Sequence, residues 1–535
     1  MKSLFWADQI AEQIIERTKG KKASVKCQQT PSGAKHIGNL NDVVRAYFPY
    51  KSLLERGIKA SFVHTSDDRD PLKDIPLKLA DLNGGWHHSE KLMEMGKYLG
   101  MPLCRIPDPF GCCSSWSKHF TKVWMDGVYA LGMRPELYSV DELYRQGKFD
   151  KYIIMTFKKA KRVGELVAKF QRTKGKGYIP FDAICSNCGR LANIDSFDLK
   201  MKRVHFVCGG KAIRKRKSEG CGYDGWVPWK EGKLQWRFEW PALWAIFNTT
   251  YEPFGKDHYE GSWKSGQVIA REIYEIEPPI PFVYEFFLVN GEKMSASRGN
   301  VYIVQDLLRI VEPEAFMFFY TKKPGKQRDL DLKTIHSLVE DFEHAERVYF
   351  GLEEEEAKTK ENLIRSYQMA SLKIPKEAPI RIPYQFAAML TQYHSDMNRM
   401  IEVLKHTGHV KDGVSKEGLE LVKKRLLLAK NWVELYAPEE YKIKLVGQGV
   451  GISKKISDRQ KMALKEFAAE LAKRDWNEKE LHNLFWELAK RNNIEPKEFF
   501  RAVYNVLLDK DSGPRLAPFI LAAGKERVID LLKQI

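Results

Sequence analysis

The stretch at residues 31–39, PSGAKHIGN, places one histidine among small residues where an apolar segment ends. A helix that begins at about Asn39 would offer unpaired N–H groups and partial positive charge to a phosphate. His36, two residues before Gly38, could donate a hydrogen bond to phosphate oxygens in a transition state. The stretch therefore predicts a phosphate-binding cradle, and the alternative is an ordinary strand-to-helix turn capped by Asn39.

A second stretch, GEKMSASRGN at residues 291–300, concentrates cations and hydroxyls in a loop flanked by glycines. Asn290-Gly291, where the stretch begins, favours the tight turn of a β-hairpin. Such loops are mobile and can close over a triphosphate. The residues that could serve this purpose are Lys293, Ser295, Ser297 and Arg298. Surface loops often contain Lys and Ser as well, so this stretch alone leaves both interpretations open.

Four cysteines in two halves predict a metal site. Cys185 and Cys188 form a CxxC pair, and Cys208 and Cys221 follow, each half near glycine. Four thiolates in this pattern fit a closed, structural Zn²⁺ site, with His205 as the alternative fourth ligand. A saturated tetrahedral site has no position for water, so the zinc would stabilise the fold and not catalyse. The alternative is a set of buried or free thiols.

A second cluster lies in DPFGCCSSWSKHF at residues 108–120, with Cys104 nearby. Carboxylate, thiolate and imidazole groups are all ligands that Zn²⁺ accepts, so a second zinc site is a hypothesis. Adjacent cysteines are unusual as joint ligands, and the spacing to the histidine is not diagnostic. The candidate ligands are Asp108, Cys112, Cys113 and His119.

The elements around these residues follow the pattern of an α/β sheet. Residues 25–30 predict a strand, and residues 40–56 a helix that Pro49 should kink and Gly57 should end. A second strand, SFVHTSDD, follows at residues 61–68. This β-α-β order predicts a parallel, nucleotide-binding sheet.

The pattern then changes along the chain. Residues 107–233 break into cysteine pairs, basic runs and tryptophans, which indicates an insertion. Regular α/β character returns at LQWRFEWPALWAIF and continues to the hairpin EFFLVNGEKMSAS. Beyond about Leu352 the chain is charged and helix-periodic to its end.

Composition limits the class of protein. The chain has 535 residues, which predicts two to four domains. A net charge of +18 and a pI near 9.2 favour a polyanionic partner. No run approaches the length needed to cross a bilayer, and the first 20 residues lack a signal peptide's apolar stretch. Large size and clustered cysteines do not fit a secreted disulfide scaffold, so a reducing cytoplasm is expected.

Together, and in this order, the stretches at residues 36–39 and 293–297 resemble the two signature motifs of class I aminoacyl-tRNA synthetases, written HIGH and KMSKS. Here they stand as HIGN and KMSAS. WRFEWPALW and EPFGKDHYEGS look like the second half of that catalytic domain. The whole chain is most similar to class I lysyl-tRNA synthetases, found mainly in archaea and some bacteria. Its end, GPRLAPFILAAGKERVIDLLKQI, looks like the helical anticodon-binding end of glutamyl-type relatives.

The resemblance implies an α/β fold: a Rossmann-type catalytic domain with a zinc-binding insertion, followed by an all-α anticodon-binding domain. The catalytic domain would occupy residues 1–106 and 234–292, with the insertion at 107–233 on the acceptor-stem side. Residues 293–352 would form the KMSKS loop and a stem-contact region, and 353–535 the helical anticodon-binding region. The basic segment KAIRKRKSEG in the insertion could touch the acceptor stem or be merely solvated.

The family's reaction joins an amino acid to ATP and then to tRNA. The amino-acid carboxylate attacks the α-phosphate, pyrophosphate leaves, and the acyl group passes to the terminal ribose of tRNA(Lys). Positioning and charge stabilisation would do most of this, with Mg²⁺ on the phosphates and Zn²⁺ as a structural ion. The implied catalytic residues are His36, Asn39 and Lys293. The implied ATP-binding residues are Pro31, Ser32, Gly33, His36, Gly38, Asn39, Lys293, Met294, Ser295, Ala296 and Ser297.

A lysine substrate makes its own demand, because an ε-ammonium in a pocket needs a carboxylate or an aromatic face. Thr30, at the end of the first strand, could meet the backbone groups of L-lysine. A monomer that binds ATP, L-lysine and tRNA(Lys), and no membrane, is expected. The candidate carboxylates are Asp67, Asp68, Glu239 and Asp257, and the candidate walls are Trp236, Trp240 and His258. At least one tryptophan of WRFEW should pack in the core instead.

Two positions depart from the family motifs. Asn39 replaces the second histidine of HIGH and can still donate a hydrogen bond. Ala296 replaces the second lysine of KMSKS, which in the family contacts ATP phosphates, so Lys293 or Arg298 would supply the charge. The alternatives are a glutamyl-type ligase, which needs a cationic pocket, and a non-catalytic tRNA-binding paralogue. A cysteine-specific enzyme would need open thiolates beside the cradle, where only Cys27 is close.

Overall fold

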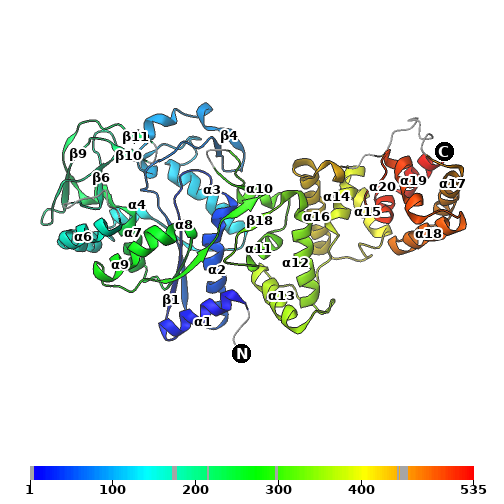
Figure 1. Cartoon of the computed structure of the whole chain (residues 1–535), viewed down its shortest axis with the longest axis horizontal. Coiled ribbons are helices and arrows are strands. Elements are labelled where there is room, and N and C mark those ends of the chain that lie inside the picture. The colour runs from blue at the N-terminus through cyan, green and yellow to red at the C-terminus, as the bar shows by residue number, and fades with distance from the viewer. Residues whose placement is uncertain (1–4, 171–177, 214–215, 296–298, 443–444, 446–455) are drawn as a thin grey trace. The chain divides into compact units, whose positions relative to one another are not determined.

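The computed structural model describes residues 5–170, 178–213, 216–295, 299–442, 445 and 456–535 (Figure 1). The chain folds into two compact units, each made of several segments. The first comprises Met1–Leu307, Met317–Leu330 and Glu356–Leu372, and the second Leu308–Phe316, Asp331–Glu355 and Lys373–Ile535.

The first unit is built on a five-stranded parallel sheet in the order β15-β14-β1-β2-β5. Its strands are β1 (Ala23–Gln29), β2 (Ala60–Ser66), β5 (Glu136–Ser139), β14 (Tyr251–Gly255) and β15 (Ile280–Tyr284). The chain adds β2 and β5 on one side of β1 and then returns to add β14 and β15 on the other. The point where strand order reverses therefore lies between β1 and β14, where sheets of this type bind ligands beyond the strands' carboxyl ends.

The strand-helix-strand unit predicted from the sequence is confirmed. The helix α2 (Leu40–Glu55) follows a short 3₁₀ turn, η1 (Ile37–Asn39), and packs on β1, β2 and β14. It contains Pro49 and is followed by Gly57 in a left-handed conformation. Its inward side chains are Leu40, Val43, Val44, Ala46, Phe48 and Leu53, spaced as one apolar helical face. The helix α1 (Trp6–Thr18) packs on α2.

The strand β5 lies inside the range 107–233 that sequence analysis assigned to the insertion, yet it pairs with β2 in the central sheet. Its sequence ELYS is short, and its residues are exposed or half-buried at the sheet edge. An edge strand of four residues carries no clear hydrophobic run, which explains why the pattern did not reveal it.

Small antiparallel sheets follow between β5 and β14. One contains β6 (Phe181–Ile184), β7 (Leu191–Asn193) and β13 (Gly232–Leu234). Another contains β8 (Ser196–Asp198), β9 (Arg203–Val207) and β12 (Asp224–Pro228). The helices α4 (Val140–Arg145), α5 (Asp150–Lys158) and α6 (Ala160–Phe170) precede these sheets and share a hydrophobic core with them.

The hairpin predicted from Asn290-Gly291 is confirmed. The strands β16 (Phe287–Val289) and β17 (Glu292–Lys293) are antiparallel, and β18 (Arg328–Leu330) pairs with β16 on its other edge. Asn290 and Gly291 have φ angles of 52° and 78°. Two successive positive φ values are what a two-residue hairpin turn of type I′ requires.

All described secondary-structure elements of the second unit are helical, as predicted for the C-terminal part. They include α12 (Ile335–Tyr349), α14 (Tyr384–Tyr393), α16 (Lys416–Leu435) and α17 (Asp458–Lys473). The chain continues through α18 (Glu478–Arg491), α19 (Pro496–Leu508), α20 (Leu516–Ala523) and α21 (Lys525–Leu532) (Figure 1, orange to red). In its interior Arg425 pairs with Glu312 at 2.6 Å and with Glu343 at 2.7 Å. No helix in the described part of the chain is long and apolar enough to cross a membrane.

Candidate functional site

A cavity of about 580 Å³ opens at the carboxyl ends of β1, β14 and β15, beside the reversal of strand order. The loops after β1 and β2, the start of α2 and the hairpin β16–β17 complete its wall. The sequence-predicted residues that line it are Thr30, His36, Gly38, Asn39, Asp67, Trp236, Asp257, His258, Lys293 and Met294. The cavity lies entirely within the first unit.

The two signature stretches, about 250 residues apart, meet at Gly38. A Cβ atom at this glycine would lie 2.9 Å from His36 Nδ1 and 3.2 Å from the methyl carbon of Met294. The backbone N–H of Ile37 donates to the carbonyl of Tyr302 at 2.8 Å, and the hydroxyl of Tyr320 donates to the carbonyl of Ile37 at 2.9 Å. The 3₁₀ turn is thus held against the segment that follows KMSAS, and the absence of a Cβ atom at Gly38 lets the side chains of His36 and Met294 lie close to it.

His36 faces the cavity as a neutral imidazole. Burial, followed by the charges of Lys35 and Lys293, lowers the pKa of His36 to about 4. Its Nδ1 atom is buried and has no hydrogen-bond partner among the described residues. A neutral ring of this kind can donate a hydrogen bond without carrying a proton charge to the site.

Two lysines supply positive charge near His36. The Lys293 ammonium lies 3.5 Å from the centre of the Phe286 ring, and its side chain is exposed. Asn300 braces this loop: its Oδ1 accepts from the Ser295 backbone N–H at 2.9 Å, and its amide donates to the Lys293 carbonyl at 3.2 Å. Sequence analysis did not single out Lys35, which lines the cavity inside the first motif.

Burial lowers the pKa of Lys35 to about 8, and its ammonium donates to the Ser32 hydroxyl at 3.4 Å. Ala296 and Ser297, expected to bind ATP, and Arg298 lie outside the described residues. Pro31, Ser32 and Gly33 are not part of the cavity wall and shape the turn behind it. The Pro31 carbonyl accepts from the Trp116 indole at 3.0 Å.

Carboxylates line the same cavity. Asp67 is buried, and its Oδ1 has no hydrogen-bond partner among the described residues. Burial, together with the charge of Asp70, raises the pKa of Asp67 well above its usual range. Asp42 accepts from the Tyr284 hydroxyl at 2.5 Å, and burial raises the pKa of Asp42 to about 7.

Sequence analysis missed Asp42 and Tyr284. Asp42 lies in the first turn of the helix that follows HIGN, and Tyr284 is the last residue of β15. Both positions face ligands in open parallel sheets, so location at a helix start or a strand end was the usable signal.

The remaining candidate residues separate into two groups. Trp236 and His258 line the cavity, whereas Trp240 is fully buried and stacks on Trp236 at 5.2 Å and 16°. This agrees with the expectation that one tryptophan of WRFEW would be a core residue. Asp68 and Glu239 do not line the cavity.

The contacts of Asp68 and Glu239 show why. Asp68 accepts from the Ser139 hydroxyl at 2.5 Å and from the Asp141 backbone N–H at 2.8 Å. Glu239 accepts from the Tyr144 hydroxyl at 2.7 Å and pairs with Lys233 at 2.9 Å. Both carboxylates are therefore occupied within the protein.

The comparison with known proteins agrees with this geometry. A family model described as tRNA synthetases class I (K) matches residues 4–373. The chain belongs to this family. A second model, described as an anticodon binding domain, matches residues 385–535.

Curated relatives match the synthetase over nearly its full length. A lysine–tRNA ligase of Natronomonas pharaonis is 35% identical, over 99% of this chain and 97% of the relative. A lysine–tRNA ligase of Methanocaldococcus jannaschii is 34% identical, over 98% of this chain and 99% of the relative. Among solved structures, a glutamate tRNA ligase from Elizabethkingia meningosepticum aligns with a TM-score of 0.42 at 14% identity, over 96% of this chain and 99% of that one.

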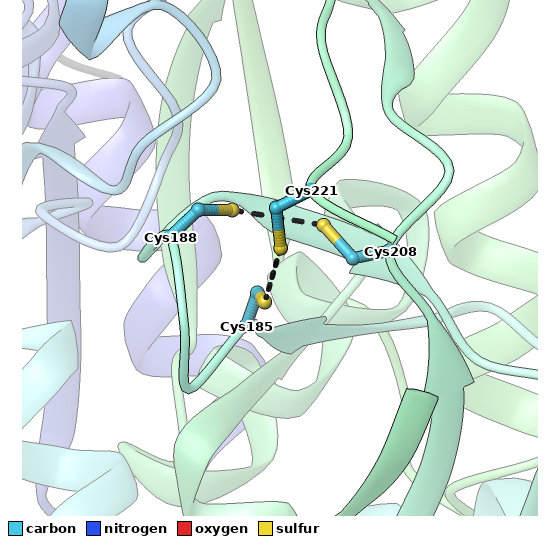
Figure 2. A group of neighbouring side chains, drawn as sticks. All are labelled: Cys185, Cys188, Cys208 and Cys221. Atoms are coloured by element: carbon cyan, nitrogen blue, oxygen red, sulfur yellow. Dashed lines mark hydrogen bonds between the residues drawn. The ribbon is translucent and has the colours of Figure 1, made fainter. Parts of the chain in front are cut away.

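The four cysteines of the synthetase's insertion converge (Figure 2). The sulfur atoms of Cys185, Cys188, Cys208 and Cys221 all lie within 4.8 Å of one another. Cys185 and Cys188 lie in the turn after β6, whereas Cys208 follows β9 and Cys221 precedes β12. Gly189 and Gly222, which follow Cys188 and Cys221, both have a φ angle of 74°. The Gly189 N–H donates to the Cys185 carbonyl at 2.9 Å, and the Gly222 N–H donates to the Cys208 carbonyl at 3.1 Å.

The pKa of Cys221 is lowered to about 6 by the backbone N–H of Tyr223 and by Asn187. This favours a thiolate, the form that binds metal, at Cys221, whereas burial raises the pKa of Cys185 and raises that of Cys208 to about 12. His205, the alternative ligand, lies between Asp195 and Asp224 at 2.8 Å from each and is not in the sulfur cluster.

The second cluster is also assembled. The ligand atoms of Asp108, Cys112, Cys113 and His119 lie within 4.8 Å of one another. The Cys112 sulfur lies 3.3 Å from His119 Nδ1, and His119 Nε2 is 2.9 Å from the carbonyl of Ala80. A backbone carbonyl on Nε2 fixes the tautomer whose Nδ1 lone pair faces the cluster. Cys104 contacts Asp141 at 3.4 Å and does not belong to the cluster.

Proposed function

We propose that this synthetase activates L-lysine with ATP and transfers the lysyl group to the 3′ end of tRNA(Lys). One observation carries the proposal: a single cavity joins His36 and Lys293 to buried carboxylates, of which Asp67 has a free oxygen. His36 and Lys293 can bind phosphates, and the carboxylates can bind an ammonium group. The names of the curated relatives, lysine–tRNA ligases from archaea, support the same substrate.

The chain's contribution to the first step is position and charge. The lysine carboxylate attacks the α-phosphorus of ATP, a phosphorus–oxygen bond forms, and pyrophosphate leaves with the electrons of the broken bond. His36 and Asn39 donate hydrogen bonds to phosphate oxygens, and Lys293 balances the negative charge on the loop side. Mg²⁺, when bound to the phosphates, would neutralise part of the same charge.

Several ATP contacts are proposed on position alone. Gly38 and Met294 line the cavity beside His36 and would bound the nucleotide. Ser295 lies next in the loop, followed by Ala296 and Ser297. Pro31, Ser32 and Gly33 would act indirectly by fixing the turn that carries His36.

The carboxylates favour lysine over an acidic amino acid. Asp67 would hold the ε-ammonium, since its free buried oxygen gains a charged hydrogen bond. Asp257, His258 and Trp236 would form the adjacent wall, and Thr30 would meet the backbone groups of the substrate. A glutamate side chain in the same place would face carboxylates instead of cations, which counts against the glutamyl alternative.

Two structural Zn²⁺ ions are proposed, one in each cluster. Cys185, Cys188, Cys208 and Cys221 provide four thiolates at mutual distances suited to a closed tetrahedral site. Asp108, Cys112, Cys113 and His119 provide a mixed set whose histidine is already oriented by a backbone carbonyl. A closed ligand set offers no open position, so these ions would stabilise the fold.

We propose that successive parts of the chain contact different parts of the tRNA. The catalytic sheet would act with the insertion on the acceptor-stem side, and the helical part would read the anticodon. A monomer in the cytoplasm is the proposed working form. The charge of +18 supports a polyanionic partner such as tRNA.

Pyrophosphate exchange with each of the twenty amino acids tests the substrate. We expect ATP-dependent exchange with lysine and much weaker exchange with the other nineteen. Exchange that is strongest with glutamate, or absent with all twenty, contradicts the proposal.

A further inference from the structure

A buried network lies behind the cavity, at the reversal point of the sheet. The Lys26 ammonium on β1 pairs with Glu252 on the neighbouring strand β14 at 2.9 Å, and both side chains are about fully buried, at 0% and 1% exposure. The indoles of Trp240 and Trp244 donate to the two oxygens of Glu252 at 3.1 and 2.7 Å. These tryptophans lie four residues apart on α7 (Trp236–Ile246), so they share one helix face.

This network reaches the cavity through Gln28. The Lys26 ammonium donates to Gln28 Oε1 at 2.7 Å. Lys26 and Gln28 are two residues apart on β1 and therefore project from the same face of the strand. Gln28 lines the cavity, whereas Lys26 does not.

The Lys26 contact determines the orientation of the Gln28 amide. An ammonium has only donors, so the amide atom that it contacts must be the oxygen. The opposite end of the same amide is the NH₂ group, which carries two donors. As long as Lys26 holds its oxygen, Gln28 therefore presents its NH₂ donors on the side away from Lys26.

The charges of the cavity indicate what such a donor would meet. Asp42, Asp67 and Asp257 line the wall and can accept from an ammonium group, whereas Asp70 pairs with Lys73 and Lys233, and Glu285 pairs with Lys256. Lysine has two ammonium groups and one carboxylate, and a carboxylate accepts hydrogen bonds only. An amide NH₂ would repel the ammonium groups and suits the carboxylate, so it complements the acidic wall.

We propose that Gln28 donates to the carboxylate of the amino-acid substrate and that Lys26 is the positioning residue that keeps its NH₂ group turned toward it. The assignment rests on the proposed function, because it takes lysine as the substrate. Glu252, held by two indoles, keeps the Lys26 ammonium in place from behind. Gln28 orients the carboxylate, which is the group that attacks ATP, and no bond to Gln28 forms.

The experiment compares two ligands that differ only in the carboxylate. Binding of L-lysine and of 1,5-diaminopentane, which is lysine without its carboxylate, is measured by titration calorimetry on the full chain. We expect Gln28→Ala to weaken lysine binding about 10- to 100-fold, the loss typical of a hydrogen bond to a charged group. Binding of the diamine should be unchanged, because the diamine has no group for the amide to contact.

Gln28→Glu is the conservative variant, since it preserves size and can still accept from Lys26. It replaces donors with an oxygen, so we expect lysine binding to weaken at least as much, and diamine binding to stay equal or improve. Lys26→Met should likewise weaken binding of lysine relative to binding of the diamine. Its control is Lys22→Met, which removes an exposed lysine just before β1. Removing Lys26 leaves a buried carboxylate unpaired and can unfold the chain, so the Gln28 variants decide the question.

Two results would overturn the assignment: equal weakening of lysine and diamine by Gln28→Ala, or no change in either. If the parent chain does not bind lysine, the proposed function fails, and with it the assignment to a lysine carboxylate. If the parent binds lysine and Gln28→Ala binds it equally, only the role of Gln28 fails.

Discussion

His36 lies where burial and two lysines disfavour a positive charge on its ring. With the pKa of His36 lowered to about 4, the imidazole is neutral near pH 7. The proposed hydrogen bond from His36 to phosphate would then not depend on a titration near pH 6.5. The nearby cations Lys35 and Lys293 carry the charge instead.

His36→Ala should lower kcat for lysine-dependent pyrophosphate exchange by about 10²–10³, the loss typical of one transition-state donor. In the parent enzyme, titration of His36 should cause no change in activity between pH 6 and 7, because the pKa of His36 lies below this interval. Thermal denaturation of the variant serves as the control and should stay close to the parent. Full exchange activity in the variant would show that the cradle does not act on ATP.

Asp67 and Asp68 are neighbours in sequence with different surroundings. Asp67→Asn should raise KM for lysine roughly 10- to 100-fold, because a charged hydrogen bond to the ammonium is lost. Asp68→Asn should leave KM unchanged and lower the melting temperature, because Asp68 is bonded to Ser139 and Asp141 inside the protein. A larger KM effect in Asp68→Asn than in Asp67→Asn would contradict the assignment.

The cavity carboxyl groups also predict a pH dependence. A carboxyl with a raised pKa is protonated, and therefore neutral, below that pKa. Burial raises the pKa of Asp42 to about 7 and that of Asp67 further above its usual range. Negative charge in the cavity therefore grows as pH rises through about 7, and KM for lysine should fall over the same interval. Exchange kinetics from pH 6 to 8.5 measure it, and a KM that rises with pH would contradict the argument.

At the scale of elements, the order of the strands decides where the cavity lies. β1 lies between β14 and β2, so residues far apart in the sequence meet at one sheet edge. The insertion between β5 and β14 has its own small sheets, tied together by cysteine turns. These strands have only three to five residues each, so a metal that joins the turns between them can add to the stability that their shared hydrophobic core provides.

Purified protein prepared without chelator should contain two zinc ions per chain. Cys185→Ser should remove one of them, and Cys112→Ser should remove the other. Cys185→Ser should also lower the melting temperature, because metal binding and folding of the insertion are coupled. Elemental analysis checks all three proteins. Parent protein without zinc would refute both sites, and loss of both ions in one variant would refute their independence.

At the scale of the whole molecule, the chain divides into a unit with the catalytic cavity and a helical unit. Within the helical unit, Trp486 on α18 is 52% exposed, whereas Tyr504 on α19 is buried and its hydroxyl donates to the Pro514 carbonyl. Trp476 is half-buried, with the Arg474 guanidinium 4.1 Å from its ring. Of these aromatics, Trp486 is therefore the one free to stack on an unpaired base.

Trp486→Ala should raise KM for tRNA(Lys) roughly tenfold, in line with the loss of one stacked base. Lysine-dependent pyrophosphate exchange should be unchanged, because the cavity lies in the other unit. Tyr504→Phe is the matched control: it should lower the melting temperature and leave KM for tRNA unchanged. Equal tRNA charging by Trp486→Ala and the parent would show that this surface does not bind RNA.

The sequence by itself determined the motifs, the first β-α-β unit, the Asn290-Gly291 hairpin and the helical C-terminal part. It also supplied both sets of metal-ligand candidates. These features depend on local patterns: turn residues, hydrophobic periodicity, and fixed spacing between ligands. Each of these patterns is contained in residues close together in the sequence, so it can be recognised without the tertiary structure.

Only the tertiary structure separated Asp67 from Asp68 and Glu239. All three are carboxylates at plausible positions, but Asp68 and Glu239 find partners in Ser139 and Tyr144, 71 and 95 residues away. The roles of Asp42, Tyr284 and Gln28 likewise depend on contacts across the sheet. Burial and hydrogen-bond partners set the charge and orientation of a polar group, and both are decided by packing between distant segments.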